Sequence, residues 1–139
     1  IFIYIYQIMD KKHKYILLKA IKFGKEKLGD SAPFTLFLSD KRNGFKTTGY
    51  YDPDRHIIAA YIKDRAICDI CRSVLHELVH HYDNVTGRVN GGEPDIGKFD
   101  HENIDPDDIE NRANAIAGSI LKEFSYKLKD EEGIDIYDT

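Results

Sequence analysis

The sequence predicts one α+β domain, and three observations support this prediction. A chain of 139 residues has the length of a single domain that can bury a core without disulfides. Three long stretches repeat apolar residues at helical spacing, and short runs between the first two are rich in β-branched and aromatic residues. Residues 1–139 are therefore expected to form an N-terminal packing helix, a small and mainly antiparallel sheet, and two further helices.

The first expected helix covers residues 10–28. Asp10 can cap its N-terminus, and Gly29 can end it. The lysines of this helix alternate with an apolar stripe and are expected to form a solvated outer face. Residues 1–9 are interpreted as either an extension or an edge strand, since they have neither the charged leader of a signal peptide nor the length of a membrane span.

Short strands are expected before the second helix. Residues 34–38 and 45–51 flank a turn that contains Asn-Gly, so the simplest prediction for them is a hairpin. A third strand is expected at residues 56–62, after a break at Asp-Pro-Asp. Asp64 follows it and can cap the second helix.

The second helix carries the motif His76-Glu77-Leu78-Val79-His80. Imidazoles four residues apart lie on one face of a helix and can reach one metal ion, while Glu77 lies about a hundred degrees around the axis. A histidine that merely packs in a core would lie among apolar residues, whereas this pair lies on the polar face, which favours a metal site in a cleft. The same face carries Asp69, Arg72, Ser73 and Asp83. The opposite face is apolar and comprises Ile67, Ile70, Cys71, Val74, Leu75, Leu78 and Tyr82.

A catalytic zinc site needs a third protein ligand and an open position for water. Glu110 is the preferred candidate, because it lies early in a third helix with strong start signals at Asp105 and Pro106. A carboxylate at the edge of that helix's apolar stripe also needs a partner. His101 is the alternative ligand, ranked lower because a loop positions a ligand less well than a capped helix does. His101 lies in the long connection between the second and third helices, residues 84–105. This connection is expected to form either a wall or lid of the cleft or a plain surface loop.

Composition excludes several classes of protein. A formal net charge of −4 argues against a dedicated nucleic-acid binder. Two cysteines, Cys68 and Cys71, are too few for a disulfide-stapled secreted domain and are expected to be buried thiols. We expect a cytoplasmic monomer that does not contact membranes. Its acidic tail, residues 128–139, is expected to be mobile.

The two motifs together resemble those of known metallopeptidases. His76-Glu77-Leu78-Val79-His80 followed by Glu110-Asn111-Arg112-Ala113-Asn114 resembles the gluzincin pattern, and in particular the ImmA/IrrE metallopeptidases and the compact minigluzincins. The resemblance implies a zincin-like fold and a role for Asn114 in orienting a histidine ligand, since gluzincins often have an aspartate at this position that does so. It also implies that one strand pairs with an extended peptide substrate at the cleft, namely His56, Ile57, Ile58, Ala59, Ala60 and Tyr61.

The expected function is hydrolysis of peptide bonds in a peptide or protein substrate. One Zn²⁺, held by His76, His80 and Glu110, would activate a water molecule, and Glu77 would act as the general base. Two alternatives stay open at this point: a phage or mobile-element protease that cleaves one repressor, and a zinc-containing module that binds peptides without cleaving them. The expected oxyanion donor is also unassigned among Tyr50, Tyr51, His101 and Tyr126.

Overall fold

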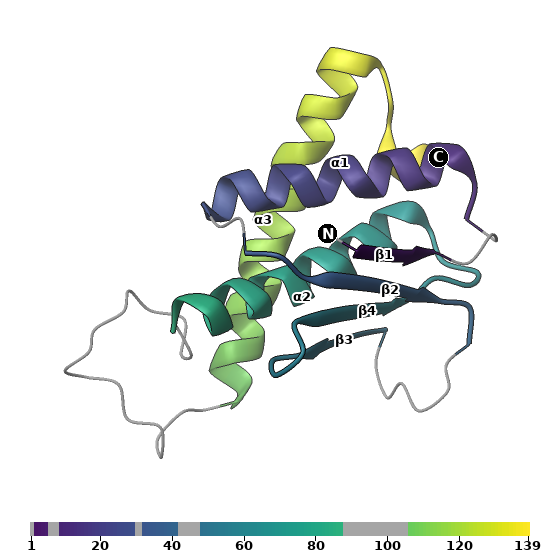
Figure 1. Cartoon of the computed structure of the whole chain (residues 1–139). Coiled ribbons are helices and arrows are strands. Elements are labelled where there is room, and N and C mark those ends of the chain that lie inside the picture. Colours follow the sequence, from purple (N-terminus) through teal and green to yellow (C-terminus); the bar gives the residue numbers. More distant parts are fainter. Residues whose placement is uncertain (1, 6–8, 30–31, 42–47, 88–105) are drawn as a thin grey trace.

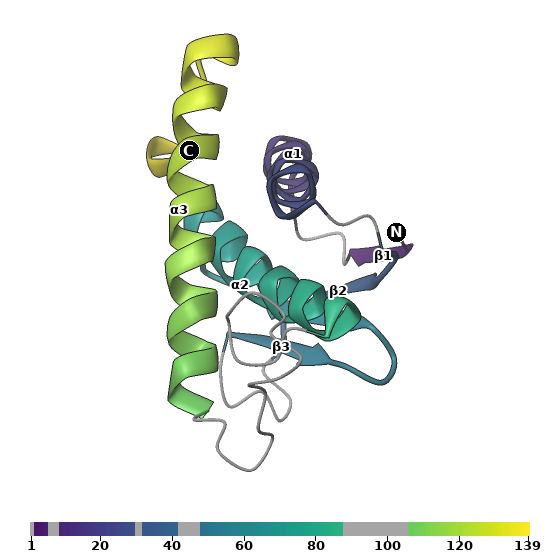
Figure 2. The ribbon, with the colours of Figure 1, turned by 90° about the vertical axis from the view of Figure 1, so that its left-hand side faces the viewer.

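The computed structural model describes residues 2–5, 9–29, 32–41, 48–87 and 106–139, and it has the expected α+β class (Figure 1). The elements follow in the order β1 (Phe2–Ile5), α1 (Lys11–Leu28), β2 (Thr35–Ser39), β3 (Gly49–Asp52), β4 (Ile57–Tyr61), α2 (Ile67–Thr86), α3 (Pro106–Glu132) and the 3₁₀ turn η2 (Ile136–Asp138). Figure 1 shows α1 and α2 on the same side of the sheet, and Figure 2 shows α3 standing upright beside this layer.

The sheet is mixed, with the strand order β1-β2-β4-β3. β1 pairs with β2, and β2 with β4, in parallel, whereas β3 and β4 are antiparallel. The prediction of a mainly antiparallel sheet is therefore wrong. Because α1 connects β1 to β2, these two strands form a crossover unit, which favours parallel pairing. β1 occupies an edge, which agrees with one of the two interpretations of residues 1–9.

The predicted hairpin between residues 34–38 and 45–51 is also wrong. β4 lies between β2 and β3, so those two strands do not pair. The antiparallel hairpin is instead formed by β3 and β4 through the turn that follows Asp52, whose Oδ1 accepts the N–H groups of Asp54 and Arg55 at 3.0 and 3.1 Å. With this pairing, β3 lies at the edge of the sheet that is nearest to the histidine motif.

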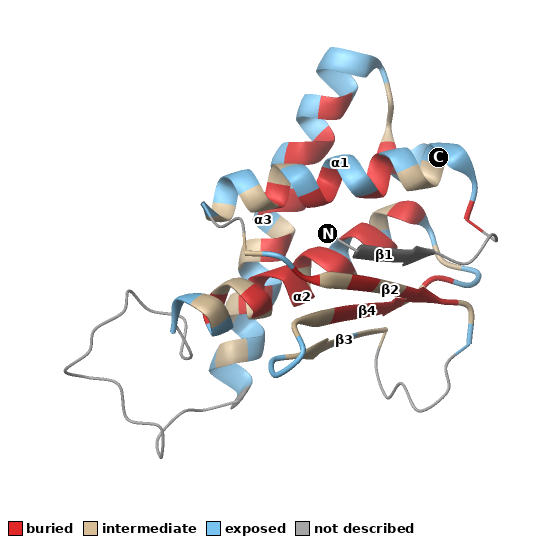
Figure 3. Cartoon of the chain, viewed as in Figure 1, coloured by how far each residue is buried: buried red, intermediate tan, exposed pale blue. Residues whose placement is uncertain are grey.

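The core lies between the sheet and the helices. Leu36 and Leu38 of β2 and Ile58 and Ala60 of β4 alternate with more exposed residues and are completely buried. Figure 3 shows buried stretches in red on β2 and β4 and on α1 and α2, which lie over the same side of the sheet. Each of the buried leucine and isoleucine side chains contributes on the order of 2 kcal/mol by leaving water, so this layer holds α2 against the sheet.

Helix α1 has the predicted ends. The Asp10 carboxylate accepts the N–H of His13 at 2.8 Å, and Gly29 adopts a left-handed φ of 75° at the C-terminus. Within the helix, Gly24 allows close approach to α2, since a Cβ there would lie 2.7 Å from Cδ2 of Leu75. The glycine therefore sets the distance between the two helices.

Helix α2 begins later than the sequence suggests. Its N-cap is Ala66, which makes no capping hydrogen bond with its side chain, so the prediction of Asp64 as the cap is wrong. Asp64 has a positive φ of 57° and belongs to the bend that leads out of β4. The helix ends at Gly87, which adopts a left-handed φ of 77°. Among the described helices, none combines the length and apolar character that crossing a bilayer requires.

Helix α3 begins at Pro106, as predicted, and extends much further than the apolar stripe indicated. Residues up to Glu132 are helical, and Glu132 accepts a hydrogen bond from Tyr15 and pairs with Lys19, both on α1. Beyond it, Ile136 is only 1% exposed and belongs to the core. The expectation of a mobile tail at 128–139 is thus corrected, because the buried side chain of Ile136 anchors it.

Candidate metal centre and cleft

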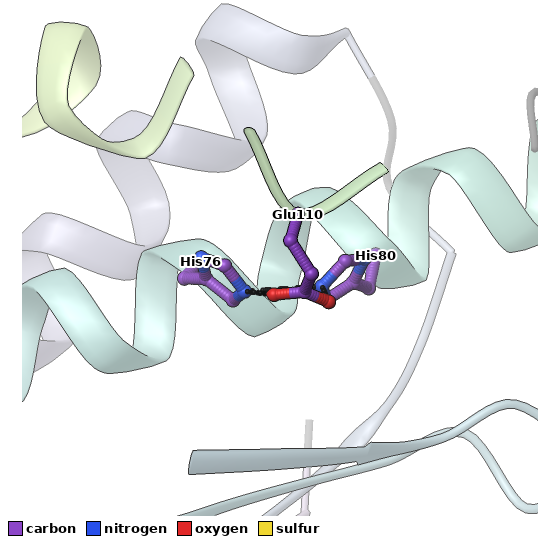
Figure 4. A group of neighbouring side chains, drawn as sticks. All are labelled: His76, His80 and Glu110. Carbon is purple, nitrogen blue, oxygen red and sulfur yellow. Dashed lines mark hydrogen bonds and ion pairs between the residues drawn. The ribbon is translucent and has the colours of Figure 1, made fainter. Parts of the chain in front are cut away.

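Three side chains converge on one point between α2 and α3. Nε2 of His76 lies 2.8 Å from Oε2 of Glu110, and Nε2 of His80 lies 3.0 Å from Oε1 of the same residue. The two ring nitrogens are 3.1 Å apart. Figure 4 shows both imidazoles on one side of α2, pointing toward the carboxylate that α3 brings across. The structure therefore brings together the three residues that the sequence nominated as ligands.

The chemistry of this group fits a zinc ion. Tetrahedral zinc with bonds of about 2.1 Å places its ligand atoms about 3.4 Å apart, only a few tenths of an ångström further than these atoms lie. Two imidazoles and one carboxylate are the ligand set of a glutamate-type catalytic site, which keeps one position for water.

Both histidines are mostly shielded, with side chains 15% and 16% exposed, whereas the Glu110 side chain is 56% exposed. Burial lowers the pKa of His80, although the nearby Glu110 carboxylate opposes that effect. A lowered pKa keeps the imidazole neutral at physiological pH, and the neutral form is the one that binds a metal.

Glu77 lies beside the ligands in a strongly buried position, 7% exposed. Burial, together with repulsion from Glu110, raises the pKa of its carboxyl to about 8. Among the described residues, none donates a hydrogen bond to this carboxyl, which leaves its oxygens directed at the cleft. Gly49 of β3 faces it so closely that a Cβ there would lie 3.2 Å from Oε1. A glycine in this strand thus makes room for Glu77.

An ion pair between α2 and α3 holds the ligand helices together. Arg112 donates through Nε and a terminal nitrogen to both oxygens of Asp83, at 3.1 and 3.0 Å. Asp83 is 5% exposed, so this two-point contact is largely shielded from water. Asp83 follows His80 by less than one turn, and Arg112 follows Glu110 by two residues. The pair therefore fixes the two helices where their ligands meet.

A cleft passes over the candidate ligand group along β3. One half, of about 410 Å³, is bordered by His76, and the other half, of about 500 Å³, is bordered by His80. Gly49, Glu77 and Glu110 line both halves. The ligand group accordingly lies at the middle of the cleft, with space for a substrate chain on either side.

The substrate strand expected at His56, Ile57, Ile58, Ala59, Ala60 and Tyr61 is misassigned. β4 is an interior strand that pairs with β2 on one side and β3 on the other, so its backbone groups are occupied within the sheet. His56 precedes the strand in the turn, with a φ of 53°. The strand that borders the cleft is β3, at the edge of the sheet.

Other predicted site residues have different outcomes. Asn114 lines the half of the cleft beside His76 but makes no hydrogen bond to His76 or His80 within the described residues, so its role in orienting a histidine stays a prediction. His101 and Asp105 lie outside the described residues. The neighbouring His81 is not part of the ligand group: it is buried, and its Nδ1 lies 2.7 Å from the hydroxyl of Tyr51.

The positions of the tyrosines in the structure reduce the number of candidate oxyanion donors. The Tyr51 hydroxyl contacts His81 and accepts a hydrogen bond from Asn84. Tyr126 lies about 24 Å along α3 from Glu110, which is too far for a role at the cleft. Tyr50 lines the half beside His80 and stays a candidate.

We compared the chain with known proteins. No family model, curated protein or solved structure matches it. The resemblance to gluzincins therefore rests on the two helical motifs.

Sequence reasoning missed residues that line the cleft or hold its helices together. Arg112 and Arg65 were not assigned a role, because an arginine on a helix or loop has no distinctive local pattern. Gly49 did offer a signal, since a glycine inside a strand often marks the close approach of another group. Its partner Glu77 could not be named until the position of β3 relative to α2 was known.

Proposed function

We propose that this protein is a zinc-dependent metallopeptidase of the gluzincin type. The observation that carries the proposal is the convergence of His76, His80 and Glu110 beside the buried carboxyl of Glu77, at the centre of a cleft. A structural zinc site would use four protein ligands and be closed, whereas the described part of the chain offers three here and they face a cleft.

When bound there, a zinc ion would lower the pKa of a water ligand towards neutrality and polarise the scissile carbonyl. Glu77 is positioned to accept the proton of that water and to pass it to the leaving amine, which is the role of a general base followed by a general acid. In the metal-free protein, burial and the nearby Glu110 carboxylate raise the pKa of the Glu77 carboxyl to about 8. Glu77 would ionise more readily beside a bound cation, since opposite charge favours the charged form.

The edge strand β3 supports an extended substrate chain. A peptide could add to the sheet alongside β3 and pass over the ligand group, with hydrogen bonds between main chains providing affinity. This arrangement gives β3 the role first expected of β4. It fits a peptide or protein substrate bound to a monomer, and the free thiols of Cys68 and Cys71 suit the expected cytoplasmic location.

The decisive experiment compares wild type with Glu77→Gln, which keeps the size of the side chain and removes the base. Both proteins should bind about one zinc ion per chain, whereas cleavage of a broad peptide library should fall by at least about a thousandfold in the variant. Cleavage at the wild-type rate by zinc-loaded Glu77→Gln would refute the mechanism. Binding of a hydroxamate and of peptides without any turnover by wild type would support the non-catalytic module instead.

The ligand set is tested separately. Glu110→Ala should abolish stoichiometric zinc binding, and His101→Ala should leave it intact. The reverse result would replace Glu110 with the alternative ligand. Cleavage of several unrelated proteins, such as casein, would count against a protease dedicated to one repressor.

A further inference from the structure

The two halves of the cleft differ in charge, and this difference bears on the substrate. Two arginines, Arg65 and Arg72, border the half beside His76, together with one carboxylate other than Glu77 and Glu110, that of Asp69. The half beside His80 has no arginine or lysine among its described lining residues and contains the carboxylate of Asp83. A negatively charged substrate group is therefore better accommodated beside His76.

Arg72 is the residue best placed to meet such a group. It precedes His76 by four residues, so it lies on the same face of α2, about 6 Å further along the axis. Its side chain is 51% exposed, and one terminal nitrogen donates to Asp69 at 3.0 Å. Within the described residues its other N–H groups make no hydrogen bond. Exposed pairs of this kind are worth only about 0–1 kcal/mol, so a substrate carboxylate can take up the remaining donors.

The surroundings of Arg72 are ordered by Arg65. Arg65 donates to the carbonyl oxygens of Tyr61 and Asp69 at 2.6 and 3.0 Å, and to Oγ of Ser73 at 2.7 Å. The Ser73 hydroxyl in turn lies 3.2 Å from Oγ1 of Thr48, at the entrance to β3. These contacts connect the end of β4, the first turns of α2 and the start of β3. The side of the cleft that carries Arg65 and Arg72 is therefore held in a defined position before any substrate binds.

The direction of β3 relates this wall to the cleaved bond. Thr48 and Gly49, at its start, border the half beside His76, whereas Tyr50, Tyr51 and Pro53, further along, border the half beside His80. An added strand that runs antiparallel to β3, the slightly more stable pairing, would enter beside Pro53 and leave beside Thr48. Residues after the cleaved bond would then lie against Arg72.

We propose that Arg72 selects substrates that carry a carboxylate within the first two residues after the cleaved bond. The carboxylate can belong to an Asp or Glu side chain, or to the free C-terminus of a short substrate, because both present the same two oxygens to the guanidinium. This inference rests on the proposed peptidase function and adds the chemical class of its substrate.

The test uses peptide sets that differ only at these positions. In the first set, every peptide has an amidated C-terminus, and peptides with Asp or Glu at these positions are compared with peptides that have Asn or Gln there. In the second set, the peptide ends one or two residues after the cleaved bond, and a free C-terminus is compared with an amidated one. For zinc-loaded wild type we expect kcat/KM to be about tenfold higher for the carboxylate in at least one set, the size of a charge-assisted hydrogen bond. The set that responds identifies the source of the carboxylate.

Variants assign the preference to one side chain. Arg72→Gln should bring the ratio of acidic to neutral peptides close to one, and Arg72→Glu should favour a lysine at the same position. Lys122→Gln removes the same charge from an exposed part of α3 about 18 Å along the helix from Glu110, and it should keep the wild-type ratio. A preference that survives Arg72→Gln, or an acid preferred before the cleaved bond, would overturn the assignment.

A binding measurement separates this inference from the function itself. Fluorescence anisotropy of the same peptides with zinc-loaded Glu77→Gln reports the preference without turnover. Selective binding of acidic peptides, with no cleavage by wild type, would remove the peptidase and retain the role of Arg72. Cleavage by wild type with no acidic preference in either assay would retain the peptidase and remove the role of Arg72.

Discussion

Replacing Glu77 with Gln should stabilise the metal-free protein, and the gain should depend on pH. Burial and the nearby Glu110 carboxylate raise the pKa of Glu77 to about 8, from 4.5 for an unperturbed side chain. Below pH 4.5 the carboxyl is protonated whether the chain is folded or unfolded, so it imposes no penalty. As the pH rises from 4.5 to 8, the unfolded chain releases this proton while the folded chain retains it, and stability is lost.

The size of the effect follows from the shift. Each pH unit in this window costs about 1.4 kcal/mol, so the penalty grows by about 3 kcal/mol between pH 5 and pH 7. Glu77→Gln removes the titrating group and keeps its volume. The difference in unfolding free energy between the variant and wild type should therefore increase by about that amount over this range.

The assay is urea unfolding of both proteins in the presence of a chelator, at half-unit steps from pH 5 to pH 8. Groups remote from Glu77 titrate in both proteins and cancel in the difference. A difference that stays constant from pH 5 to pH 8 would refute the buried, protonated state of Glu77.

Four further outcomes follow from contacts in the structure. Arg112→Ala should cost about 3 kcal/mol, because it leaves the buried Asp83 carboxylate without its two-point partner, and adding Asp83→Asn should recover part of that loss in a double-mutant cycle of urea unfolding. Gly49→Ala should lower kcat severalfold with a small change in Tm, since the new methyl group would displace the Glu77 side chain, and unchanged kcat would count against this contact. Ile136→Ala should lower stability by about 2–4 kcal/mol in the same unfolding assay, whereas a mobile tail would tolerate it. Zinc binding at pH 7 should release about one proton more from wild type than from Glu77→Gln, measured with a pH indicator dye.

The ligand group was largely predictable because its geometry is local. The spacing of His76 and His80 places both side chains on one helical face in any fold that keeps the helix. Glu110 could be nominated because helix-start signals and a carboxylate beside an apolar stripe lie close together in the sequence. The ends of α1 were predictable for the same reason, since capping involves residues within one turn.

The sheet was predicted less well because strand order depends on distant parts of the chain. The local pattern of residues 34–51 favours a hairpin, but β4 pairs with β2 and displaces β3 to the edge. This strand order buries the side chains of Leu36 and Ile58. No local sequence pattern distinguishes it from the order in which residues 34–38 and 45–51 form a hairpin. Because β3 and not β4 lies at the edge of the sheet, the strand proposed to pair with a substrate is β3, whereas the sequence had suggested β4.

The sequence by itself therefore determined which side chains form the candidate ligand group and the candidate base, because helical periodicity and caps act over a few residues. Tertiary structure decided what surrounds them. Packing of α2 against the sheet buried Glu77 beside Gly49, and the crossing of α3 joined Asp83 to Arg112. It also brought the arginine-bearing start of α2 against the start of β3, since contacts between elements far apart in the chain form only when the core assembles.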